Sequence, residues 1–123
     1  MAGVLVVDDQ AGVRMLLQEV FKREGYQVEV AGDGIQAIEK RTGFLPDLIL
    51  MDMQMPHMNG LEAATRILKQ KPEQKIILMT ASGEGDIEQQ AQNVGIKWCI
   101  QKPFDIFLLS QEVERIIKSE YKE

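Results

Sequence analysis

The sequence has 123 residues, which fits one domain with a hydrophobic core of ordinary size. Its 19 acidic and 14 basic residues give a net charge of −5, which argues against nucleic-acid binding, because such surfaces need clustered lysine and arginine. A single cysteine excludes an intramolecular disulfide and a cysteine-rich zinc site. The longest apolar run covers residues 1–7, too short to cross a membrane and without the basic region of a signal peptide. We therefore expect a cytoplasmic protein without a membrane partner.

Apolar runs of strand length alternate with segments of helical periodicity along the chain. Residues 4–7 predict a buried strand, and the helix that follows is expected to end at Gly25, a typical helix stop. Residues 27–31 predict a second strand. Asp33, with a glutamine three residues later, predicts the cap of a helix that reaches about Thr42.

The second half of the chain repeats this alternation. Strands are expected over residues 48–51, 76–79 and 98–101. Helices are expected over residues 60–70, with Asn59 as the cap, over residues 87–94, and from residue 106 with an apolar stripe to residue 117, the last running almost to the end of the chain. Short strands that are apolar on both faces favour a parallel sheet covered by helices on both sides. Right-handed crossovers then give a doubly wound α/β fold with five strands and five helices. We expect a single domain over residues 1–123, with no output domain.

Polar residues stand where each of four strands ends. Asp8 and Asp9 follow the first strand, Asp52 the third, Thr80 the fourth and Lys102 the fifth. The carboxyl ends of parallel strands lie at one edge of the sheet, where ligands bind. We therefore expect these residues to converge, although each one alone is more often a turn residue, a helix cap or a solvated surface group.

The residue types at this edge favour phosphoryl chemistry. Three carboxylates in one crevice repel each other, and a hard divalent cation such as Mg²⁺ relieves that repulsion. Lys102 adds a positive charge, and Thr80 offers a hydroxyl to a phosphoryl oxygen. Asp52 is the expected nucleophile, because a carboxylate can attack phosphorus to form an aspartyl phosphate.

With these residues in place, the chain resembles the receiver domain of two-component response regulators over almost its whole length. The matching segments are residues 6–9, 47–53, 55–56 with 59–60, 79–81 and 102–104. The resemblance implies a flavodoxin-like fold with strand order 2-1-3-4-5. Four shorter segments also resemble the stand-alone regulators of sporulation phosphorelays, namely residues 7–10, 19–21, 24–27 and 102–106.

The resemblance implies a role for each residue of the acidic cluster. Asp52 would accept a phosphoryl group from a phosphohistidine. Asp9, Asp52 and the main-chain carbonyl of Gln54 would bind Mg²⁺ directly, and Asp8 would bind it through a water molecule. Lys102 would pair with Asp52 at rest and with a phosphoryl oxygen afterwards.

The resemblance also implies a switch built from Thr80 and Ala81. Thr80 would move inward to bond the phosphoryl group, and Ala81 leaves room beside it. Many receivers carry an aromatic residue three positions before the lysine, where this chain has Cys99, which we interpret as a small buried strand residue. The Lys102–Pro103 peptide is expected to be cis.

Partners are expected to dock beside the phosphorylation site. By resemblance these partners would be a sensor histidine kinase, a downstream histidine phosphotransferase and an aspartyl-phosphate phosphatase. The expected absence of an output domain favours a monomer. The candidate docking residues flank the crevice: Gln10, Gly12, Val13, Leu16, Pro103 and Phe104. Val13 and Leu16 are also candidates for the core, and for Leu16 the two interpretations are equally good.

Two functions remain open on this evidence. The first is a stand-alone phosphoryl carrier of a phosphorelay, with a possible role in sporulation. The second is a single-domain regulator whose phosphorylated surface binds a target, as in chemotaxis. The protein would catalyse its own phosphoryl transfer and dephosphorylation. A small-molecule phosphatase of the dehalogenase type is disfavoured, because Gln54 stands where those enzymes carry an acid.

Overall fold

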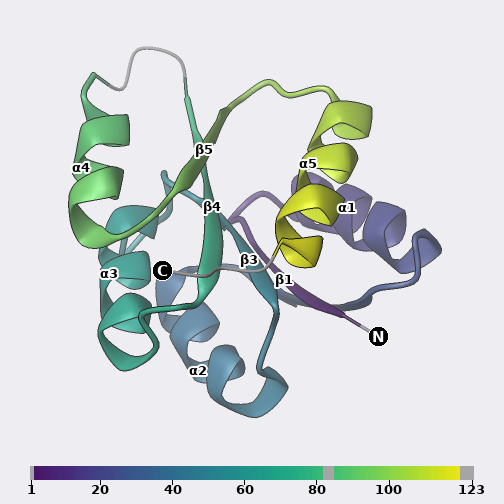
Figure 1. The fold of residues 1–123 in the computed structure, drawn as a ribbon, viewed down its shortest axis with the longest axis horizontal. Helices are drawn as coiled ribbons and strands as arrows, with labels where there is room; N and C mark the ends of the chain where they lie inside the picture. The colour runs from purple at the N-terminus through teal and green to yellow at the C-terminus, as the bar shows by residue number, and fades with distance from the viewer. Residues whose placement is uncertain (1, 82–84, 120–123) are drawn as a thin grey trace.

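The computed structural model describes residues 2–81 and 85–119, and strands alternate with helices throughout (Figure 1). The strands are β1 (Gly3–Val7), β2 (Gln27–Ala31), β3 (Leu48–Asp52), β4 (Lys75–Thr80) and β5 (Trp98–Gln101). The helices are α1 (Ala11–Arg23), α2 (Gly34–Phe44), α3 (Gly60–Gln70), α4 (Ile87–Val94) and α5 (Ile106–Lys118). Every predicted element is present in the predicted order.

The five strands form one parallel sheet in the order β2-β1-β3-β4-β5. Every residue of β1 and β3 is buried, which explains their continuously apolar sequences. The register pairs Val7 with Met51 and Asp52 with Met79, so β1, β3 and β4 end within two residues of the same level. The expected fold class and strand order are confirmed.

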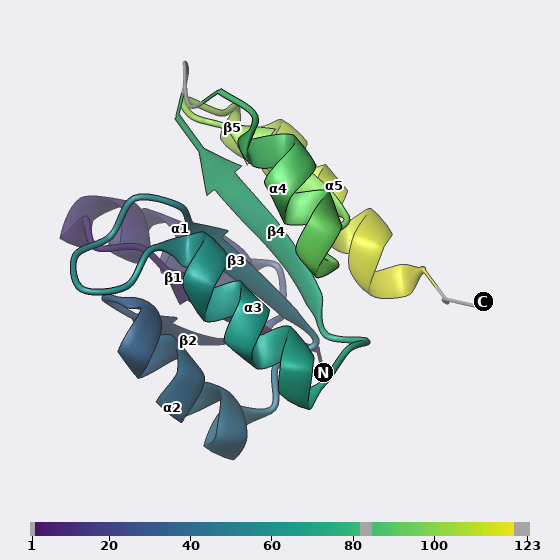
Figure 2. The ribbon, with the colours of Figure 1, turned by 90° about the vertical axis from the view of Figure 1, so that its left-hand side faces the viewer.

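The sheet separates two hydrophobic cores (Figures 1 and 2). Helices α1 and α5 cover one face, with Leu17, Phe21 and Val113 buried against the strands. Helices α2, α3 and α4 cover the other face through small residues such as Ala37 and Ala64. Alternate residues of each strand enter the two cores, as the two-residue repeat of a strand requires.

The predicted caps fix the ends of several helices. The carboxylate of Asp33 accepts the N–H of Gln36, and the side chain of Asn59 accepts the N–H of Glu62, both at 2.9 Å. Gly25 has a positive φ of 96° just after α1, as the sequence predicted. These turns set the directions in which the chain re-enters the sheet.

Helix α2 is longer than its sequence predicted. It continues past Gly43 to Phe44, whose ring packs against β1, so that a Cβ placed on Gly3 would lie 3.1 Å from it. Leu45 then ends the helix in the left-handed conformation with φ of 57°. The packing of Phe44 outweighs the tendency of Gly43 to end the helix.

Helix α5 ends at Lys118, and the expectation that it runs almost to the end of the chain concerns residues 120–123, which lie outside the described part. The Lys75 Nζ donates hydrogen bonds to main-chain carbonyls of Ile116 at 2.8 Å and Ser119 at 2.9 Å. This lysine therefore holds the end of α5 at the start of β4. Among the described residues no helix is long and apolar enough to cross a membrane.

Candidate functional site

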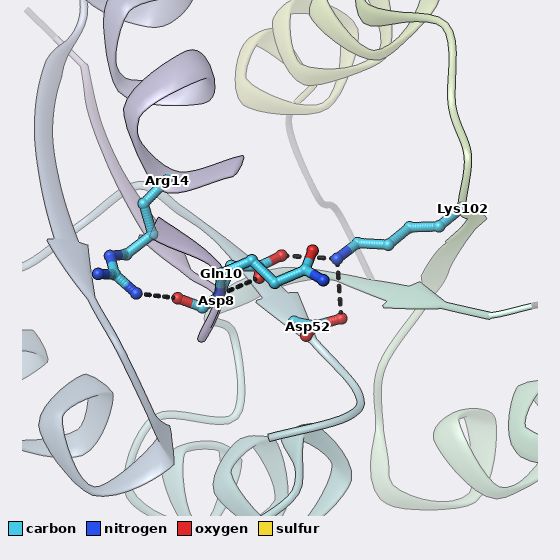
Figure 3. A network of polar contacts seen from close by, with 5 residues as sticks. All are labelled: Asp8, Gln10, Arg14, Asp52 and Lys102. Atoms are coloured by element: carbon cyan, nitrogen blue, oxygen red, sulfur yellow. Dashed lines mark hydrogen bonds and ion pairs between the residues drawn. The ribbon is translucent and has the colours of Figure 1, made fainter. Parts of the chain in front are cut away.

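Three carboxylates meet at the carboxyl edge of the sheet, and Figure 3 shows two of them, those of Asp8 and Asp52. Asp8 follows β1 and is fully buried, whereas Asp52, the last residue of β3, is 6% exposed. Asp9 is exposed beside them. One oxygen from each of the three carboxylates lies within 4.8 Å of the other two. The structure thus brings together the three acidic residues that the sequence placed at strand ends.

Asp8 is held by contacts from three parts of the chain. Its Oδ1 accepts the main-chain N–H of Gln10 at 2.9 Å, and its Oδ2 accepts a hydrogen bond from Lys102 Nζ at 2.6 Å. Its main-chain carbonyl accepts a hydrogen bond from Arg14 at 2.7 Å. A buried carboxylate needs such partners, because an unpaired buried charge is costly.

Lys102 joins two of the acidic residues. Its Nζ lies 2.6 Å from Asp8 Oδ2 and 3.2 Å from Asp52 Oδ1. Its main-chain N–H donates to the carbonyl of Thr80 at 2.6 Å, and the following peptide bond to Pro103 is cis, as expected. The sequence anticipated the pair with Asp52 but not the shorter one with Asp8.

The surroundings raise the pKa of both Asp52 and Lys102, which has opposite effects on their charges. Burial, followed by the charge of Asp8, raises the pKa of Asp52 to about 6, although Lys102 opposes this shift. Burial lowers the pKa of Lys102, but its hydrogen bond to Asp8 and the charge of Asp52 outweigh burial and leave the pKa above its ordinary value. Lys102 therefore stays charged at neutral pH, whereas Asp52 binds a proton more readily than an ordinary aspartate.

The oxygen donors of this cluster fit a hard divalent cation. Mg²⁺ prefers carboxylate oxygens and water, and the exposed Asp9 lies on the solvent side of the pair formed by Asp8 and Asp52. One lysine cannot neutralise three carboxylates, so a cation would also relieve the remaining repulsion. Gln54 is exposed in the loop after β3, and its carbonyl as a ligand stays a prediction.

Gly60 lets the start of α3 approach Asp52 closely, which the sequence analysis missed. A Cβ at this position would lie 2.2 Å from the main-chain oxygen of Asp52, and the N–H of Gly60 donates to the carbonyl of Met53 at 2.9 Å. No other residue type fits such an approach without moving the backbone. The only signal in the sequence was a glycine directly after the predicted cap Asn59.

The model of the response regulator receiver domain matches residues 4–114. The chain belongs to the receiver family. It is 41% identical over 114 residues to sporulation initiation phosphotransferase F of Bacillus subtilis, covering 93% of this chain and 92% of that protein. It is 38% identical over 118 residues to the chemotaxis protein CheY of Thermotoga maritima, covering 94% and 97% of the two chains.

Solved structures give the same family. The crystal structure of the response regulator protein TrrA from Thermotoga maritima in complex with Mg²⁺-BeF has a TM-score of 0.85 and 34% identity, covering 94% of this chain and 99% of that one. The Vibrio cholerae chemotaxis protein CheY4 has a TM-score of 0.88 and 30% identity, covering 94% and 98%. The family and the fold expected from the sequence are therefore shown.

The candidate switch residues of this receiver share one cavity. Thr80, Ala81 and Cys99 line a space of about 260 Å³ that also reaches the start of α4. Cys99 is half-buried on β5, and burial, followed by the charge of Glu88, raises the pKa of its thiol. The raised pKa favours the protonated thiol over the reactive thiolate. The movement of Thr80 stays a prediction.

The expected docking residues of the receiver divide into two groups. Val13 and Phe104 are half-buried and pack against the core shared by α1 and α5. Leu16 is 54% exposed, so it is not a core residue, and neighbouring Met15, which the sequence analysis did not single out, is 69% exposed. The others are exposed: Gln10, Gly12 and Pro103. Helix α1 therefore presents apolar side chains beside the acidic cluster.

Proposed function

We propose that this receiver accepts a phosphoryl group on Asp52 from a phosphohistidine of a sensor histidine kinase, in the cytoplasm and with Mg²⁺. It then passes the group to the histidine of a downstream phosphotransferase in a phosphorelay. The arrangement of Asp52 between Asp8, Asp9 and Lys102 carries this proposal. The 41% identity to sporulation initiation phosphotransferase F supports the relay and extends the proposal to sporulation control.

The transfer needs little covalent chemistry beyond Asp52. A carboxylate oxygen of Asp52 attacks phosphorus and the bond from phosphorus to the histidine nitrogen breaks. The electron pair of that bond stays on the nitrogen, and the proton on the other ring nitrogen lets the imidazole leave as neutral histidine. Asp52 must be ionised to attack, so its raised pKa sets a lower pH limit. Bound Mg²⁺ would supply charge neutralisation at the phosphoryl oxygens.

Lys102 supplies a second positive charge from the chain itself. Its Nζ lies 3.2 Å from Asp52 Oδ1, within reach of an oxygen on a phosphoryl group attached there. When the group leaves Asp52, Lys102 returns to the pair with both carboxylates. Thr80, the last residue of the adjacent strand β4, would donate its hydroxyl to the same group and transmit the change to the cavity beside α4 that it lines.

A second candidate function is a regulator whose phosphorylated surface binds a target protein. The 38% identity to a chemotaxis protein favours it. Phe107 and Leu108 on α5 are 66% and 58% exposed, and Leu108 lines a cavity of about 400 Å³ with Trp98 and Cys99. This surface lies on β5 and α5, apart from the docking residues of α1.

Onward transfer distinguishes the two functions. The protein is phosphorylated with acetyl phosphate, freed of the donor, and mixed with a histidine-containing phosphotransferase. The relay predicts that the phosphoryl group leaves Asp52 and appears on the histidine as an acid-labile, base-stable phosphate. A phosphorylated receiver that gives nothing to the histidine, and keeps the group as long as without it, contradicts the relay and favours target binding. A dephosphorylation partner would instead release inorganic phosphate.

A further inference from the structure

Arg14 contacts the acidic cluster through the main chain and not through a carboxylate. Its guanidinium Nη1 donates to the carbonyl of Asp8 at 2.7 Å, from the first turn of α1 (Figure 3). Arg14 is half-buried, and its N–H makes the first turn's hydrogen bond to the carbonyl of Gln10 at 3.0 Å. No motif or spacing in the sequence marks this residue.

The position of the guanidinium is built into the neighbouring loop. A Cβ placed on Gly32 would lie 3.4 Å from Nη1 of Arg14, at van der Waals contact, so the guanidinium lies directly against this loop. The N–H of Gly32 is held by the side chain of Gln36 at 2.9 Å. On the other side of the same peptide segment, the N–H of Asp8 donates to the carbonyl of Ala31 at 3.1 Å. The end of β2, the end of β1 and the start of α1 thus meet at Arg14.

The bonded carbonyl belongs to the peptide group that links Asp8 to Asp9. Because a peptide group is planar, fixing the direction of its carbonyl also fixes the direction of the Asp9 N–H and the starting point of the Asp9 side chain. Asp9 is exposed, so packing restrains its side chain less than it restrains those of the buried Asp8 and Asp52. The Arg14 hydrogen bond therefore restrains the part of the cluster that packing leaves least restrained.

We propose that Arg14 is a positioning residue for the cation site, which orients the peptide between Asp8 and Asp9 so that the Asp9 carboxylate is presented for Mg²⁺ binding. This inference rests on the proposed function. Residues that orient metal ligands in this way typically change metal affinity by about 10- to 100-fold when replaced.

The sign of the effect separates positioning from charge alone. Arg14 is a cation near the site, so through its charge alone its removal would make the cluster more negative and tighten Mg²⁺ binding. As a positioning residue its removal weakens Mg²⁺ binding. Arg23 offers a matched control, because it lies in the last turn of the same helix, carries the same charge and is largely exposed.

The test is calorimetric titration of Mg²⁺ into the wild-type protein and the Arg14→Met and Arg23→Met variants, with thermal unfolding in EDTA to verify folding. We expect the dissociation constant to rise about tenfold in Arg14→Met and to stay unchanged in Arg23→Met. If Arg14→Met does not fold, Arg14→Gln replaces it under the same criterion. An unchanged or lower dissociation constant overturns the inference. A wild-type protein that binds no Mg²⁺ overturns it together with the proposed function.

A second readout excludes a general structural defect. Phosphorylation by acetyl phosphate is followed against Mg²⁺ concentration in the same variants. Positioning predicts that the half-saturating Mg²⁺ concentration rises in Arg14→Met, while the rate at saturating Mg²⁺ returns to the wild-type value. A rate that stays low at saturating Mg²⁺ contradicts a role confined to cation binding and overturns the inference.

Discussion

Asp52 lies in surroundings that disfavour its ionised form. Burial and the charge of Asp8 raise its pKa to about 6 from an ordinary value of 3.8, even though Lys102 lies 3.2 Å away. The folded protein thus stabilises the protonated form of Asp52 relative to the ionised form, which is the form that reacts. A cation or a phosphoryl group at this position changes that balance, which makes Asp52 the residue most sensitive to the state of the site.

The raised pKa of Asp52 predicts that Asp52→Asn stabilises the protein in a pH-dependent way. Between about pH 4 and 6, Asp52 is ionised in the unfolded chain but still protonated in the folded protein. The free energy of unfolding of the wild-type protein therefore falls as pH rises through this range, and it stays at the lower value above pH 6. We expect the free energy of unfolding of Asp52→Asn to exceed that of the wild-type protein by about 2 kcal/mol at pH 7.5 and by almost nothing at pH 3.5. Urea denaturation in EDTA measures this difference. Asp33→Asn, which keeps a helix cap, is the control. Equal gains at both pH values would contradict the raised pKa.

The same acid predicts how Mg²⁺ binding depends on pH. A protonated Asp52 cannot ligate a cation, so protons and Mg²⁺ compete for it. We expect the dissociation constant for Mg²⁺ to rise about tenfold for each pH unit below about 6 and to change little above pH 7.5, measured by calorimetry. A dissociation constant that stays constant from pH 5 to 8 would show that Asp52 is not a ligand.

At this scale the sequence located the acidic residues and Lys102 but not all of their contacts. Residues at the ends of parallel strands share one edge, and that rule needs no side-chain detail. The Lys102–Asp8 pair and the Arg14 hydrogen bond depend on rotamers and on the space beside Gly32, which no spacing rule encodes.

At the scale of single elements, the start of α3 positions the phosphoacceptor. Gly60 brings the first turn of the helix against the carbonyl of Asp52, and Asn59 caps that turn. The cap was predictable from residue type, as was the cap at Asp33. The end of α2 was not, because the packing of Phe44 against Gly3 is a contact between distant segments.

Replacing Gly60 by alanine is therefore expected to damage the site through the backbone. The added Cβ overlaps the Asp52 carbonyl at 2.2 Å, so the helix start or the strand end must move. We expect Gly60→Ala to lose about 3 kcal/mol of unfolding free energy and to be phosphorylated more slowly than wild type. Gly43→Ala is the matched control, because nothing lies within 4 Å of its Cβ and alanine favours the helix by about 0.5–1 kcal/mol. Equal stability of both variants would refute the close approach.

At the scale of the whole molecule, the parallel sheet assembles a site from residues that are far apart in the sequence. Asp8 and Lys102 are 94 positions apart in the sequence, yet Lys102 Nζ lies 2.6 Å from Asp8 Oδ2. Alternation of strands and helices predicted the doubly wound class, but the strand order came from the family resemblance, because apolar patterns do not state which strands are neighbours.

The central claim is that Asp52 accepts a phosphoryl group with the help of Mg²⁺. The most direct test incubates the wild-type protein and Asp52→Asn with acetyl phosphate, and in parallel with phosphoramidate, with Mg²⁺ or with EDTA, and records intact mass. We predict one added phosphoryl group in the wild-type protein with Mg²⁺, and none in EDTA or in Asp52→Asn. A wild-type protein that gains no mass from either donor, or an Asp52→Asn variant that gains the same mass, would contradict the account.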